Sequence, residues 1–77
     1  MTESFEVLQQ TAYAKGQAIK QQHRRQRRVL LGTKVSLLAS DFAHAHLYQE
    51  LQDWHVPNTH ARIGAYVRAF EDGYQHG

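Results

Sequence analysis

The sequence predicts an all-α fold, a small domain of three helices, on three observations. Apolar residues recur at intervals of three or four along most of the chain, which is the period of a helix packed on one side. Turn-forming residues interrupt this pattern at residues 32–33 and 55–57. The chain has only 77 residues, 42% of them hydrophobic, and no cysteine, so packing alone must stabilise its core. We therefore expect residues 1–77 to form a single helical domain.

The first predicted helix spans about residues 3–31 and follows Thr2, whose hydroxyl can cap its first turn. Leu30 returns to the angular position of the apolar stripe after a basic stretch, which indicates one continuous helix. Such a helix is longer than a domain of this size can cover. Its basic part should therefore project, fray or pair with a second copy, and a helical dimer is one predicted assembly. The stripe consists of Phe5, Leu8, Ala12, Gly16 and Ile19.

The second predicted helix spans about residues 34–54, after a break at Gly32. Its apolar side chains lie on two opposite sides of an ideal helix, which leaves two interpretations. In the one that we favour, a single helix with a kink near Ser40 is buried on both sides. In the other, Ser40 and Asp41 cap a new helix that follows a short apolar turn or strand. Trp54, at the end of this segment, is expected in the core.

The third predicted helix spans about residues 59–74, and Pro57 separates it from the second. Asn58 or Thr59 can cap its first turn. Gly73, near its end, is expected to let the last turn fray. Its apolar stripe, in which Phe70 is a core candidate, consists of Ile63, Tyr66, Val67, Phe70 and Tyr74.

The charge of the chain is unevenly distributed. The total is only +2, but residues 15–34 carry +7 without one acidic residue, which leaves −5 for the rest of the chain. Arginine suits polyanions because its planar guanidinium donates paired hydrogen bonds to phosphate oxygens or to guanine. We therefore expect a small non-enzymatic regulator that binds nucleic acid, DNA or RNA, through a basic helix at residues 20–28. The residues expected to contact it are Lys20, Arg24, Arg25, Arg27, Arg28 and Lys34.

The sequence RRQRR at residues 24–28 resembles the arginine-rich RNA-binding motifs of lentiviral transactivators and phage antiterminators. The resemblance is limited to this short run and implies RNA binding by a basic helix, whereas the rest of the chain does not follow those short peptides. A purely structural explanation of the same residues is a solvated helix end, because cations are favoured near the negative end of the helix dipole.

A second class of function fits the same sequence. A protein-interaction module or small inhibitor, of the kind that mobile elements encode, would use the basic helix against an acidic protein or would pair with itself. Tyr13 and Tyr74 are the aromatic residues expected at such a partner surface.

A helix-turn-helix over residues 44–70 is a weaker alternative for nucleic-acid binding, because Ala61 and Gly64 replace the larger apolar residues that normally pack its two helices together.

No pattern in the sequence predicts catalysis or a cofactor, because nucleophile elbows, phosphate-binding loops and dinucleotide motifs are missing from it. His44 and His46 point about 200° apart on a helix and cannot share a metal ion. His55 and His60 straddle a turn where they can converge, but no cysteine supports them, so we expect no metal site. A membrane span needs roughly 18 to 20 consecutive apolar residues, so we expect no membrane partner and a cytoplasmic location.

Overall fold

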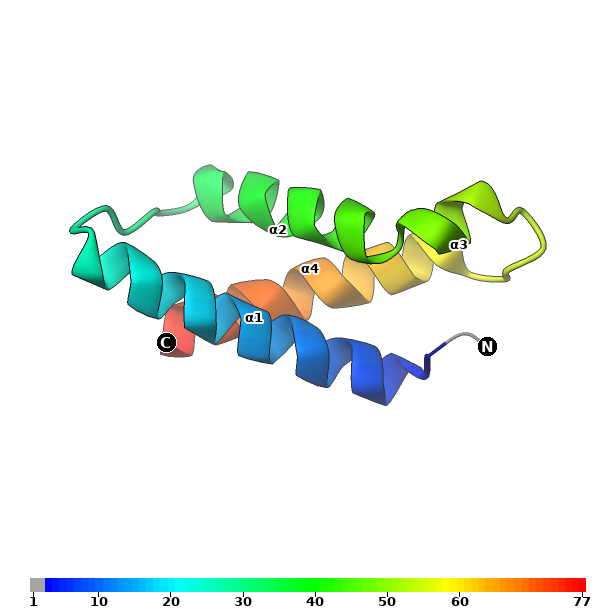
Figure 1. The fold of residues 1–77 in the computed structure, drawn as a ribbon, viewed down its shortest axis with the longest axis horizontal. Coiled ribbons are helices and arrows are strands. Elements are labelled where there is room, and N and C mark those ends of the chain that lie inside the picture. Colours follow the sequence, from blue (N-terminus) through cyan, green and yellow to red (C-terminus); the bar gives the residue numbers. More distant parts are fainter. Residues whose placement is uncertain (1–2) are drawn as a thin grey trace.

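The computed structural model describes residues 3–77, which form a small all-helical domain, as the sequence predicts (Figure 1). Its helices are α1 (Phe5–Arg25), α2 (Thr33–His46), α3 (Tyr48–Gln52) and α4 (Thr59–His76), and residues 3–77 contain no strand. α1 and α4 run in the same direction, and α2 runs in the opposite direction (Figure 1). The Cα atoms extend over 42 × 20 × 16 Å, so the domain is a short rod with the α1–α2 connection at one end and α3 at the other.

The tightest packing in the domain brings the backbones of α1 and α4 together. A Cβ atom at Gly16 would collide with the carbonyl oxygen of Phe70, and one at Gly73 would collide with the carbonyl oxygen of Tyr13. Only glycine permits such an approach at these two positions. Gly73 therefore holds α4 against α1, and the prediction that it loosens the helix end was wrong, since α4 continues to His76.

The core lies where α2 packs on this pair of helices. Phe70 is completely buried, and its ring centroid lies 5.5 Å from that of Phe42 and 6.5 Å from that of Tyr66. Burying one such side chain contributes about 2–3 kcal/mol to folding. The prediction that Phe70 belongs to the core is confirmed. The buried hydrophobic residues are Leu8, Ala12, Val35, Ala39, Ala43, Leu47, Tyr66, Phe70 and Tyr74.

α1 ends at Arg25, so the predicted continuous helix over residues 3–31 was wrong. Arg27 adopts the left-handed conformation with a φ of 55°, and the amide of Arg28 donates to the carbonyl of His23 at 2.9 Å. These features form the Schellman motif, which ends a helix and usually has glycine at the left-handed position. Because arginine stands there instead, the sequence carries no visible stop signal.

The helix starts follow local capping rules only in part. Ser4 caps α1, since its Oγ accepts a hydrogen bond from the amide of Val7 at 3.2 Å, whereas the predicted cap Thr2 lies outside the described residues. Gly32 precedes α2 with a φ of 58°, which confirms the predicted break. Asn58 stands at the cap position of α4, but its side chain makes no capping hydrogen bond.

The predicted helix over residues 34–54 is divided into two helices at Leu47. Leu47 has a φ of −99° and a ψ of 16°, and its side chain is buried. Ser40, where a kink was considered, lies inside α2, and residues 34–39 are helical, so the strand interpretation was wrong. Trp54 was expected in the core, but it follows α3 and is 86% exposed, because the bend carries it past the end of the bundle.

Candidate nucleic-acid interface

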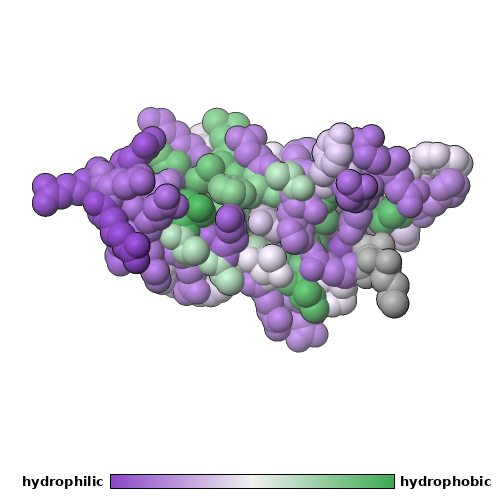
Figure 2. All heavy atoms as spheres, viewed as in Figure 1, coloured by the Kyte–Doolittle hydropathy of each residue, from purple (hydrophilic) through white to green (hydrophobic). Residues whose placement is uncertain are grey.

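Five of the residues predicted to bind nucleic acid gather at one end of the rod. Arg24 and Arg25 end α1, Arg27 and Arg28 lie in the connection that follows, and Lys34 lies in the first turn of α2. All five side chains are exposed. Strongly hydrophilic side chains project from this end of the molecule, at the left in Figure 2. We call these five residues the basic end.

The charges of the basic end are not neutralised within the part of the chain that the structure describes. Cations are favourable next to the C-terminus of α1, where the helix dipole is negative, but the dipole supplies only about half a charge. The cluster therefore keeps a positive potential that attracts anions. The close contacts between basic and acidic side chains within residues 3–77 lie elsewhere: Arg62 forms an ion pair with Glu50, and the imidazoles of His46 and His55 contact the carboxylates of Glu3 and Asp53.

Lys20 does not join the basic end, although the sequence placed it in the same set. Its Nζ atom donates a hydrogen bond to the carbonyl oxygen of Tyr74 at 3.0 Å and lies 4.6 Å from the centre of the Tyr74 ring. The side chain is half-buried against α4. Its ammonium group is thus engaged with the C-terminal turn of α4.

Tyr74, predicted at a partner surface, is instead buried in the core and positions the basic end. Its hydroxyl accepts a hydrogen bond from the amide of Leu30 at 2.7 Å and contacts Nδ1 of His23 at 2.9 Å. These contacts attach both the end of α1 and the α1–α2 connection to Tyr74 on α4. Arg27 and Arg28 are therefore carried by a segment that is anchored on each side. Sequence reasoning placed Tyr74 on the apolar stripe of its helix, and that signal was the correct one.

Apolar side chains border the basic end. Val29 and Leu31, in the α1–α2 connection, are 43% and 80% exposed, and Leu37 on α2 is 63% exposed. Exposed aliphatic groups next to arginines can contact the faces of unstacked bases or the sugar edge while guanidinium groups bind phosphates. The sequence analysis did not predict this border, because it considered only Leu30 of this segment, as the residue that returns to the apolar stripe of a continuous helix.

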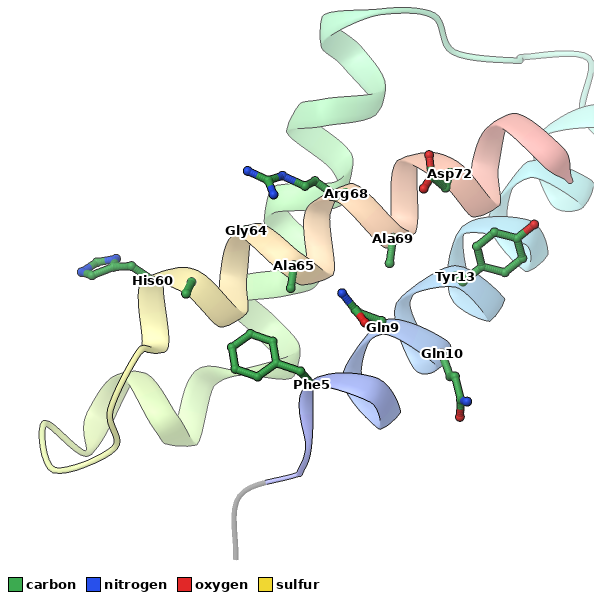
Figure 3. Close-up of a pocket in the computed structure, with 11 residues that line it drawn as sticks. Phe5, Gln9, Gln10, Tyr13, His60, Gly64, Ala65, Arg68, Ala69 and Asp72 are labelled. Atoms are coloured by element: carbon green, nitrogen blue, oxygen red, sulfur yellow. The ribbon is translucent and has the colours of Figure 1, made fainter.

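Tyr13 belongs to a different surface. It is 36% exposed, and its ring lies 6.3 Å from that of His76. With Phe5 it forms the α1 side of an open groove of about 820 Å³ between α1 and α4 (Figure 3). The structure therefore separates the two predicted partner residues, since Tyr74 is in the core and Tyr13 is on this groove.

No set of three or more histidine, aspartate or glutamate side chains within residues 3–77 is arranged to hold a metal ion. None of the four helices in this range combines the length and apolar character needed to cross a bilayer.

The chain matches no protein-family model, no curated protein and no solved structure.

Proposed function

We propose that this chain is a small non-enzymatic protein that binds nucleic acid through its basic end. The observation that carries the proposal is the grouping of four exposed arginines without a carboxylate partner in residues 3–77. Guanidinium groups keep their charge at any physiological pH and match the geometry of phosphate oxygens. Nucleic acid is the polyanion that best matches such a cluster, because each neutralised phosphate releases a counterion.

The shape of the basic end favours contacts with the phosphate backbone over base reading in the major groove. α1 stops at Arg25, so the arginines cluster at the end of α1 and in the α1–α2 connection, and they do not lie along one face of a projecting helix. Such a cluster can contact several adjacent phosphates, but it offers no long helix that could enter the major groove of a duplex. We therefore expect binding with weak sequence preference. This differs from the RNA binding by a continuous basic helix that the resemblance to arginine-rich motifs implies.

The experiment is a titration of fluorescently labelled DNA duplex and RNA hairpin with the purified protein, followed by anisotropy. Replacing Arg24, Arg25, Arg27 and Arg28 with Gln should abolish binding, because the phosphate contacts supply nearly all of the affinity. Circular dichroism of the variant should match the wild type, since none of the four side chains is buried. Binding that survives this substitution would remove the proposal.

A matched pair of variants separates local contacts from total charge. Arg27→Gln with Arg28→Gln lowers the charge by two at the basic end. Gln49→Glu with Gln52→Glu lowers it by the same amount on α3, at the far end of a rod that is 42 Å long. Screening over about 10 Å makes the second change nearly silent at physiological salt. Equal losses of affinity in the two variants would contradict a localised site.

A protein-interaction module or small inhibitor is the second candidate function, and Trp54 favours it. This side chain is 86% exposed at the end opposite the basic end, and Tyr48 nearby in the sequence is 57% exposed. Tryptophan and tyrosine are enriched among the residues that dominate protein interfaces. A stoichiometric protein partner that survives nuclease treatment and is lost on Trp54→Ala would establish this function.

A further inference from the structure

An open groove of about 820 Å³ lies between α1 and α4, and no residue of α2 lines it. Its floor is made of small residues on α4, including Gly64, Ala65 and Ala69, and Phe5 and Tyr13 stand on the α1 side (Figure 3). A Cβ atom at Gly64 would meet no other atom within 4 Å, so the floor has a vacant hollow there. One face of α4 therefore packs on α2, while this face has no cover within the chain.

We propose that this groove is the interface of a homodimer in which the α4 helices of two copies pack antiparallel across a two-fold axis. The charges on its rim indicate the arrangement. Arg68 and Asp72 lie one helical turn apart, both line the groove, and both are exposed. Neither makes an ion pair with another residue in the range 3–77. In an antiparallel pair, Arg68 of each copy faces Asp72 of the other, whereas a parallel pair would place like charges together.

The same register fits an aromatic side chain into the hollow. When Arg68 lies opposite Asp72 of the second copy, Gly64 lies opposite His76. Tyr13 stacks on His76 of its own copy, with 6.3 Å between ring centroids. The Tyr13 ring of each copy is thereby brought to the hollow at Gly64 of the other. A self-complementary patch of this kind, with a knob and a hole on the same surface, is what a two-fold interface requires.

The exposed area of the chain is consistent with such an interface. The accessible surface is 5460 Å², whereas a compact monomer of this mass exposes about 4,800 Å². The excess of roughly 650 Å² is spread over the whole elongated chain, and it is comparable to the area of about 800 Å² that each partner buries in a standard interface. The small side chains on the groove floor allow the helices of the two copies to approach closely. A second copy is therefore an occupant of suitable size and charge.

Charge-swap variants in analytical ultracentrifugation test the proposal. The wild type should sediment as a dimer. Arg68→Asp and Asp72→Arg should each raise the dissociation constant at least about tenfold, because two attractive contacts become repulsive. The double variant should form a dimer again, and an equimolar mixture of the two single variants should form a heterodimer. The control Asp41→Arg changes an exposed charge on α2, outside the groove, and should leave the dimer intact.

Gly64→Leu gives a second and independent test. A Cβ atom at this position meets nothing within 4 Å, so the added side chain starts in open space, and we expect the fold to be kept and the dimer to be lost. A wild type that is monomeric at its highest soluble concentration would overturn the proposal and leave the groove to a helix of another protein. So would single variants that dissociate but are not rescued by mixing. These results do not depend on nucleic-acid binding, because every groove variant keeps the basic end.

Discussion

Arg62 donates two hydrogen bonds to Glu50, from Nε and Nη2, each 2.8 Å long, and this pair joins α4 to α3. The side chains are only 4% and 16% exposed, respectively. The ring of Phe5 covers the guanidinium, with its centre 5.4 Å away. Arg62 lies off the apolar stripe of its helix, so periodicity alone would place it in solvent. It is buried because Glu50 provides a matching charge at the point where α3 turns back toward α4.

Replacing Glu50 with Ala should destabilise the domain by about 3 kcal/mol, because the Arg62 charge would remain buried without a partner. Urea unfolding followed by circular dichroism measures this loss. Asp53→Ala is the matched control, since its pair with His55 is largely exposed and should contribute less than about 1 kcal/mol. Similar losses in the two variants would show that the Arg62–Glu50 pair has no special role.

The contact between α1 and α4 predicts opposite effects of one substitution at two glycines. Gly73→Ala should cost about 3 kcal/mol, because the new Cβ atom would collide with the backbone of Tyr13 and push the helices apart. At concentrations low enough to keep the chain monomeric, Gly64→Ala should instead stabilise the domain by roughly 0.5–1 kcal/mol, since its Cβ atom meets open space and alanine favours the helix. Thermal unfolding of both variants compares them, and a tolerated alanine at Gly73 would contradict the close approach.

Tyr74→Phe should loosen the connection that carries the basic end. Without the hydroxyl, the amide of Leu30 loses its acceptor at 2.7 Å, which costs about 1–2 kcal/mol. Hydrogen exchange at this amide should accelerate in the variant. Tyr48→Phe serves as the control, because the Tyr48 side chain is 57% exposed and should change neither quantity. Unchanged protection of the Leu30 amide in Tyr74→Phe would show that Tyr74 does not anchor the connection.

The stability of the domain should fall at high pH through Tyr66. Burial raises the pKa of the Tyr66 hydroxyl above its usual value of 10.0, and the negative charge of Glu3 raises this pKa further. The unfolded chain therefore releases this proton at a lower pH than the folded domain does. The resulting stability is fully present below pH 10.0 and is lost as the pH rises through the higher folded-state pKa.

The variant Tyr66→Phe isolates this effect, because it keeps the aromatic contacts with His46 and Phe70 and removes the titrating group. Unfolding midpoints measured from about pH 8 to pH 11 should decline more steeply for the wild type than for the variant. Parallel declines for the two proteins would contradict the assignment to Tyr66.

The periodicity of the sequence identified most of the buried residues, but it did not show where the helices end. The predicted stripes were correct at Leu8 and Phe70, because a period of three to four residues reports the buried side of a helix, but the prediction was wrong at Phe5, which begins the first stripe and is 42% exposed. The end of α1 was missed because Arg27 takes a left-handed conformation that glycine usually signals. Trp54 was misplaced because the bend at Leu47 follows from tertiary packing, and no turn-forming residue marks it.

The basic end and the groove between α1 and α4 differ in how far the sequence could predict them. The basic end could be predicted, since its arginines are neighbours in the sequence and stay together in any helix or turn. The groove could not, because it arises only when α4 packs parallel to α1 with Gly16 and Gly73 at the crossing points. Tyr74 was an intermediate case. Its place on the apolar stripe indicated burial, but its hydrogen bond to Leu30 joins residues that are far apart in the sequence.

The salt dependence of nucleic-acid binding tests the central claim most directly. For contacts between the four arginines and four phosphates of a DNA duplex, the logarithm of the association constant should fall with the logarithm of salt concentration at a slope of about −3.6. Arg27→Gln with Arg28→Gln should reduce the magnitude of that slope by about 2, because two phosphates would no longer be neutralised. A wild-type slope near zero, or a slope that this variant leaves unchanged, would contradict binding through the basic end.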